Sequence, residues 1–232
     1  MKVLIFGATG MVGQAALRES LRAADVTYVQ TVGRMPTGQL DPRLNEVMHR
    51  DLYDYQSIEA SLRGFDACFF CLGVSSAGMS EADYARLTYD ATLAAASTLA
   101  RLNPQMTFVY VSGAGTDSTE QGKSMWARVK GRTENALRRL PFKGVYLFRP
   151  GVIQPLHGIR SKTRAYRVLY ALTGPLLTLL RGVMPNQILT TTDIGQAMLA
   201  VARGGANTAV LEAPDIRALS QSAASVQAAR AG

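Results

Sequence analysis

The chain has 232 residues, of which 47% are hydrophobic and 18% charged, with a formal net charge of +8 and 2 cysteines. This length allows one domain with a large core, and this composition excludes a disordered chain or a disulfide scaffold. Because a buried strand is predicted from residue 2 onward, we expect no secretory signal and a reducing, cytoplasmic setting.

The first predicted strand runs into three glycines. The apolar residues 3–6 lead into Gly7, Gly10 and Gly13, and a helical pattern covers 11–23. Gly7 permits a tight turn, Gly10 lets the backbone approach a phosphate, and Gly13 lets the helix pack close to the strand. The free N–H groups and the positive end of that helix then face an anion. The spacing between a strand and a helix predicts a dinucleotide-binding loop.

Strands and helices alternate along the rest of the chain. Strands are expected at 27–32, 47–49, 67–72, 107–111, 145–148 and 209–211, and helices at 55–62, 81–102, 124–140 and 194–202. Ser80 with Asp83, and Thr190 with Asp193, predict capped helix starts. Apolar strands alternating with amphipathic helices predict an α/β fold, a doubly wound parallel sheet of the Rossmann type, in a single domain over 1–232.

The cysteines lie inside a predicted strand. Cys68 and Cys71 are three residues apart, so they point to opposite faces of the sheet. Buried apolar cysteines are therefore favoured over a redox or metal pair, and no metal site is predicted.

The segment 150–187 breaks the alternation and predicts a small C-terminal substrate lobe, whereas the tail 220–232 is expected to fray. Its apolar run, 168–180, is too short to span a membrane. Between residues 122 and 181 there are thirteen Lys or Arg and one acid. This charge suggests an anionic small-molecule ligand, and a solvated basic face is equally compatible. Nucleic acid is not favoured, and membrane-surface contact through Arg160, Lys162, Arg164 and Arg167 is a weaker alternative.

The residues after the second and third strands bear on the cofactor. Arg34 follows the second strand directly, and residues 33–40 contain no acid that could accept a ribose 2′-hydroxyl. An Arg here favours a 2′-phosphate, so the sequence predicts NADP(H), with NAD as the alternative if Arg34 is only a surface cation. Asp51 and Leu52 could contact the adenine, or Asp51 could instead cap the helix near Tyr55.

Further motifs follow the later strands in order: Cys71-Leu72-Gly73, Val111-Ser112-Gly113, Val129-Lys130-Gly131 and Arg149-Pro150-Gly151. With the glycine loop, they resemble an atypical short-chain dehydrogenase/reductase. The nearest branch is related to nucleoside-diphosphate-sugar epimerases and nitrogen-metabolite-repression regulators. The resemblance covers about residues 1–212.

The resemblance implies roles for individual residues. Ser112 would orient a carbonyl or hydroxyl, and Lys130 would bind the nicotinamide ribose and lower the pKa of a catalytic Tyr. Lys130 could instead be a surface lysine paired with Glu134. Cofactor-binding positions are expected at Gly7, Thr9, Gly10, Met11, Val12, Gly13, Arg34, Asp51, Leu52, Leu72, Gly73, Lys130, Pro150 and Gly151.

One departure from the family pattern affects the predicted activity. Trp126 stands where the Tyr of the Tyr-x-x-x-Lys signature is expected. An indole N–H donates a hydrogen bond but is not a usable acid or base. Either another residue supplies the proton, with His157 as the best candidate and Tyr84 and Tyr89 as further options, or the protein binds NADP without turnover. The sequence therefore predicts an NADP(H)-binding oxidoreductase or epimerase-like enzyme, with a non-catalytic redox sensor or scaffold as the alternative.

Overall fold

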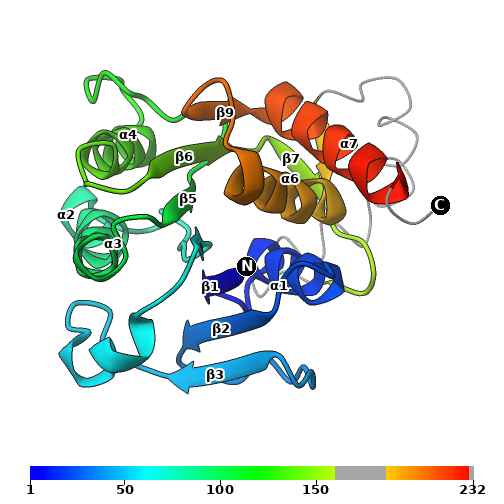
Figure 1. Cartoon of the computed structure of the whole chain (residues 1–232). Coiled ribbons are helices and arrows are strands. Elements are labelled where there is room, and N and C mark those ends of the chain that lie inside the picture. Colours follow the sequence, from blue (N-terminus) through cyan, green and yellow to red (C-terminus); the bar gives the residue numbers. More distant parts are fainter. Residues whose placement is uncertain (160–186, 230–232) are drawn as a thin grey trace.

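The computed structural model describes residues 1–159 and 187–229 (Figure 1). Its centre is a parallel seven-stranded sheet in the order β3-β2-β1-β4-β5-β6-β9. The strands are β1 (Lys2–Phe6), β2 (Tyr28–Gly33), β3 (Leu44–Met48), β4 (Ala67–Phe70), β5 (Thr107–Val111), β6 (Gly144–Arg149) and β9 (Val210–Glu212). A short parallel pair, β7 (Val152–Gln154) and β8 (Ile188–Thr190), lies outside this sheet. The predicted doubly wound parallel sheet is confirmed.

Helices cover both faces of the sheet, and successive buried residues of β1 alternate between the two cores (Figure 1). Val3 and Ile5 belong to the core beneath α1 (Met11–Arg22) and α6 (Thr191–Gly204). Leu4 and Phe6 belong to the core beneath η1 (Gln56–Leu62), α3 (Ala91–Leu102) and α4 (Met125–Leu137). Phe6 pairs with both Val32 and Phe70, so β1, β2 and β4 end at one level. The strand order reverses beside β1, and ligands bind at such switch points.

The segment 81–102, predicted as one helix, is three consecutive pieces. They are α2 (Glu81–Ala85), the π-helical η2 (Arg86–Asp90) and α3. Both predicted caps form: the Ser80 and Thr190 hydroxyls accept from the backbone N–H groups of Asp83 at 3.1 Å and Asp193 at 3.0 Å. The segment 55–62 is a 3-10 helix, η1.

At the C-terminus, α7 (Ala213–Ala229) extends into the segment 220–232, for which the sequence predicts fraying. The Ser220 hydroxyl lies within hydrogen-bonding distance of Asp193 and Gln196 on α6, at 3.3 and 3.1 Å, which ties the start of that segment to α6. The predicted substrate lobe falls mostly on 160–186, together with Arg160, Lys162, Arg164 and Arg167, and so lies mostly outside the described residues. In the part of the chain that is described, no helix is long and apolar enough to cross a membrane.

The two cysteines occupy opposite sides of the sheet, as predicted. Cys68 is buried in the core beneath α3, whereas Cys71 packs against the core beneath α1. Burial raises the pKa of both thiols, that of Cys71 to about 12. Both thiols are therefore protonated at neutral pH, Cys68 inside the core and Cys71 at its edge, where it lines a cavity.

Candidate functional site

The loop between β1 and α1 requires glycine at Gly7 and Gly13, because other backbone atoms approach these positions closely. Gly7 has a φ of +75°, and a Cβ built on it would lie 2.8 Å from the backbone carbonyl of Cys71. A Cβ on Gly13 would lie 2.1 Å from the Gly7 carbonyl oxygen. The Gly10 N–H donates to that same oxygen at 2.9 Å and closes the turn. The first turn of α1 carries no acidic residue, so its N-terminus is suited to an anion.

The larger cavity at the carboxyl ends of the strands has a volume of about 510 Å³. Loops after β1, β4, β5 and β6 form its wall together with α4. None of the described residues that line it is Asp or Glu. The predicted site residues on this wall are Gly7, Thr9, Gly10, Met11, Val12, Arg34, Leu72, Gly73, Ser112, Lys130, Pro150 and Gly151. Gly13 lies behind the loop and acts through packing.

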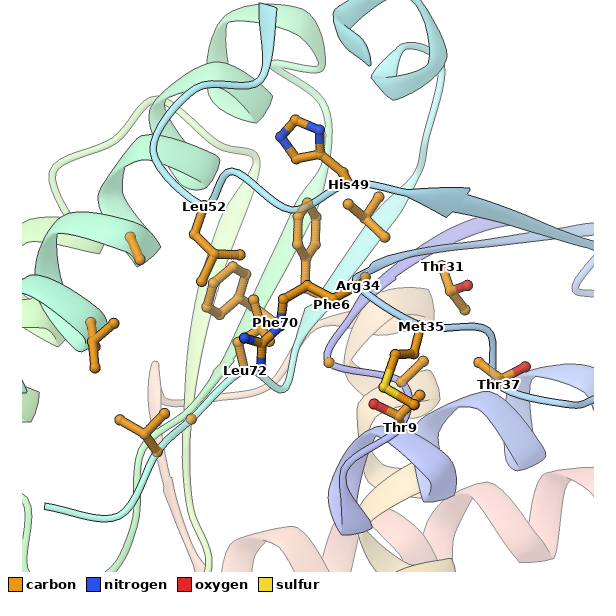
Figure 2. Close-up of a pocket in the computed structure, with 18 residues that line it drawn as sticks. Phe6, Thr9, Thr31, Arg34, Met35, Thr37, His49, Leu52, Phe70 and Leu72 are labelled. Carbon is orange, nitrogen blue, oxygen red and sulfur yellow. The ribbon is translucent and has the colours of Figure 1, made fainter. Parts of the chain in front are cut away.

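A second cavity of about 300 Å³ adjoins the first and shares the glycine loop, Arg34 and Leu72 with it (Figure 2). Its wall is mostly apolar, with Val32, Phe70 and Leu87. The Arg34 side chain extends over this cavity toward Phe70 and Leu72 in Figure 2. Within the described chain, no hydrogen bond or ion pair engages its guanidinium. An apolar cleft bordered by an unpaired cation suits a base that carries a phosphorylated ribose.

Of the residues after β3, Leu52 lines this cavity, whereas Asp51 forms hydrogen bonds within a turn. Leu52 lines the cavity (Figure 2). Asp51 does not line it, and its carboxylate accepts from the backbone N–H groups of Tyr53 at 2.8 Å and Asp54 at 3.2 Å. His49, which sequence reasoning left without a role, also lines the cavity, with its Nε2 2.7 Å from the Asp54 carbonyl oxygen. His49 follows directly after a parallel strand, and residues at that position commonly line the ligand cleft of such a sheet.

At the other end of the cleft, the Ser112 hydroxyl is bound by groups on the side away from the cavity. Its hydroxyl lies 2.6 Å from Glu134 Oε1 and 3.2 Å from the Phe148 carbonyl oxygen. Both groups are acceptors, so the single hydroxyl proton is directed into the protein, and the oxygen presents lone pairs to the cleft. Glu134 is buried and also accepts from Arg149 Nε at 3.1 Å and from Arg149 Nη2. Glu134 is thus the ion-pair partner of Arg149, not a surface partner of Lys130.

Lys130 is half-buried on α4 beside Ser112. Its ammonium donates to the Ser112 carbonyl oxygen and lies 5.9 Å from the centroid of the Tyr110 ring. Burial lowers the pKa of Lys130 to about 8, while the nearby Glu134 carboxylate acts to raise it. The group is therefore mostly charged at neutral pH and can exchange a proton close to it.

Trp126 and His157 lie apart from this pair. Trp126 is half-buried in the first turn of α4 and is not on the wall of the larger cavity; a Cβ built on Gly115 would lie 3.6 Å from its Cη2. Of the described residues on that wall, none is Tyr. His157 is exposed and lines a third cavity of about 330 Å³ beside α1. The residue before it is tied to the start of α6, because the Leu156 N–H donates to Thr191 Oγ1 at 3.0 Å. The structure does not bring His157 together with Ser112 and Lys130.

The chain is similar to several curated proteins, although no family model matches it. It is 27% identical to protein HTATIP2 of Rattus norvegicus over 154 residues, which span 65% of this chain and 62% of the rat protein. It is 26% identical over 201 residues to protein fmp52-2 of Aspergillus oryzae, covering 86% of this chain and 85% of that one. The fungal protein is named as mitochondrial, whereas the sequence of this chain predicts a cytoplasmic setting.

Solved structures with the same fold include nicotinamide-cofactor complexes. The Bordetella bronchiseptica enzyme WbmF in complex with NAD+ superimposes with a TM-score of 0.65 at 14% identity, covering 98% of this chain and 78% of that one. A short-chain dehydrogenase/reductase-family oxidoreductase from Burkholderia thailandensis gives 0.64 at 17% identity, covering 94% and 92%. Together with the sequence motifs and the parallel sheet, these similarities confirm that the chain resembles the atypical short-chain dehydrogenase/reductases with a Rossmann fold.

Proposed function

We propose that the chain binds NADP(H) along the joined cavities and acts as an oxidoreductase or epimerase-like enzyme on a small molecule. The observation that carries this proposal is the arrangement of the cleft. Arg34, which has no partner within the described chain, the glycine loop and Lys130 lie along it in the order that adenosine 2′-phosphate, pyrophosphate and nicotinamide ribose would require. The solved complexes with NAD+ support a nicotinamide dinucleotide as the ligand class.

The preference for NADP(H) over NAD(H) rests on Arg34. An acidic residue that accepted the 2′-hydroxyl would repel a 2′-phosphate, and the described cavity walls carry no such residue. The guanidinium has no partner within the described chain, so pairing it with a phosphate breaks no existing contact.

Fluorescence titration with NADPH and NADH tests this preference. We expect Arg34→Ala to weaken NADPH binding about 10- to 100-fold, the range for a lost charge-assisted hydrogen bond, and to leave NADH binding unchanged. The matched control is Arg50→Ala, because Arg50 is exposed and lines neither cavity. Equal losses for the two cofactors, or equal losses for the two variants, would contradict the assignment.

In the reaction, the bound nicotinamide would supply or accept the hydride. Lys130 would donate hydrogen bonds to the ribose and exchange a proton with the substrate oxygen, since its pKa of about 8 lies near neutrality. The Ser112 oxygen would accept a hydrogen bond from a substrate hydroxyl, because its own proton is directed to Glu134 or Phe148. An anionic substrate suits the absence of carboxylates on the described wall.

A non-catalytic NADP(H)-binding sensor or scaffold is the second candidate, and the position of Trp126 favours it. No described residue on the wall of the larger cavity supplies a phenol. We expect Trp126→Tyr to create or strongly increase NADPH turnover on a carbonyl panel if the protein has lost an ancestral activity. High turnover by the unmodified protein on any member of that panel would eliminate the sensor and support the enzyme.

A further inference from the structure

One buried carboxylate joins three elements directly behind the reactive end of the cleft. Glu134 on α4 contacts Ser112 at the end of β5 and Arg149 at the end of β6. Both of its oxygens are used: Oε1 accepts from Ser112 and Arg149 Nε, and Oε2 accepts from Arg149 Nη2. Glu134 itself is not on the wall of the cavity.

These contacts fix pieces of the wall. Pro150 and Gly151 follow Arg149 immediately and line the cavity, and the Pro150 carbonyl oxygen accepts from the Ala114 N–H at 3.0 Å. Ser112 makes two hydrogen bonds to β6. Its N–H donates to the Phe148 carbonyl oxygen at 2.9 Å, and its hydroxyl lies 3.2 Å from the same oxygen. A buried ion pair is weak evidence for stability, because well-packed apolar residues often serve as well. Its place behind the cleft therefore suggests a functional reason for retaining it.

The charges around Lys130 come from several elements. On α4 there is Glu134, one turn away; from β6 comes Arg149, which is itself paired; and from β5 comes the neutral Tyr110 ring. The half-buried Glu212, at the end of β9, contacts the Arg149 guanidinium through Nη1 at 3.4 Å. Burial lowers the pKa of Lys130, and Glu134 is the charged group that opposes this effect.

We propose that Glu134 is a positioning residue of the NADP(H) site. Its carboxylate directs the Ser112 hydroxyl inward and keeps the Lys130 ammonium charged beside the cleft. Cofactor affinity thus depends on a residue that touches no cofactor atom. This inference rests on the proposed function, because it assumes that NADP(H) occupies the cavity that Lys130 lines.

The test is the pH dependence of NADPH binding between pH 6 and 9.5, measured by fluorescence on the full chain. Wild-type affinity is expected to be highest near pH 7, because the 2′-phosphate of the cofactor becomes protonated near pH 6. It is expected to fall as the pH rises through about 8, because the neutral amine of Lys130 binds the anionic cofactor less well. Glu134→Gln removes the charge that opposes the burial effect. Its affinity is therefore expected to match wild type at pH 6 and to be roughly 3- to 10-fold weaker at pH 8.

Two further variants isolate the effect. Glu134→Gln with Arg149→Gln avoids leaving Arg149 unpaired if the single variant is unstable. It should show a smaller loss at pH 8, because removing the Arg149 cation partly restores the charged form of Lys130. Glu212→Gln removes the half-buried carboxylate on the same guanidinium and should follow the wild-type curve. A role confined to stability would move the melting temperature without moving the midpoint of the binding curve.

The outcomes separate the two proposals. Failure of the wild-type protein to bind NADPH at any pH would overturn the proposed function. Wild-type binding with the same pH midpoint in every folded Glu134 variant would overturn the role of Glu134 alone. An equal shift in Glu212→Gln would also overturn it, since the effect would then belong to the Arg149 guanidinium.

Discussion

The two ends of the cleft are built in different ways. At the end that Arg34 borders, where we propose that the adenosine binds, the backbone shapes the cavity, its wall is mostly apolar, and Arg34 has no partner within the described chain. At the reactive end, the polar groups already bind one another: Ser112 donates inward and Lys130 donates to the Ser112 carbonyl oxygen. The first end is ready to receive a ligand group, whereas at the second the ligand must fit an existing network. This difference suggests that the structure supports cofactor binding more clearly than it supports catalysis.

The largest effect is expected at the buried ion pair of the reactive end. Glu134→Leu should lower the free energy of unfolding by about 3–5 kcal/mol, because it leaves a buried guanidinium without its main partner. Glu134→Leu combined with Arg149→Leu should recover most of that loss. Chemical denaturation measures both, and a double variant as unstable as the single one would contradict the account of the pair.

At the adenosine end, Gly13→Ala should lower stability by roughly 2 kcal/mol or more and abolish NADPH binding, since its Cβ would lie 2.1 Å from the Gly7 carbonyl oxygen. Gly10→Ala is the matched variant, because its Cβ would lie 3.3 Å from that same oxygen. It should retain most of the stability and still lose affinity, since the Cβ occupies space that the phosphate needs. Thermal melting and NADPH titration separate the two effects. Normal NADPH binding by Gly13→Ala would refute the steric explanation of the loop.

A smaller effect of opposite sign is expected for Lys130→Met. The pKa of Lys130 is lower in the folded state than in the unfolded chain, so folding is penalised below a pH of about 8, and the penalty fades as the pH rises toward the unfolded value. The Met variant should gain about 1–2 kcal/mol of stability at pH 7, after allowance for solvent screening, and should lose NADPH affinity. Denaturation at pH 7 and pH 10 checks the sign, and a gain that does not shrink at pH 10 would rule out the desolvation of Lys130 as its cause.

Features set by local sequence signals could be predicted, whereas contacts made by tertiary packing could not. The parallel sheet, its alternating helices and the glycine loop follow from apolar runs, capping residues and glycine spacing, which are local signals. The doubly wound order follows in addition from the right-handedness of the crossovers. The sequence leaves Asp51 open between an adenine contact and a cap of the helix near Tyr55, because a carboxylate can serve either role. In the structure its carboxylate accepts from the N–H groups of Tyr53 and Asp54 in a turn. Glu134 and Arg149 were not recognised as a pair, since they are brought together by the packing of α4 against the sheet. His157 lies on another cavity because of a tertiary contact between Leu156 and Thr191.

The most direct test of the central claim is a crystal structure of the protein with NADP+. The account predicts the pyrophosphate over Gly7 and Gly10, the 2′-phosphate against Arg34, and the nicotinamide ribose within hydrogen-bonding distance of Lys130. A cofactor whose adenosine end lies beside Lys130, or crystals that remain without cofactor at saturating NADP+, would contradict it.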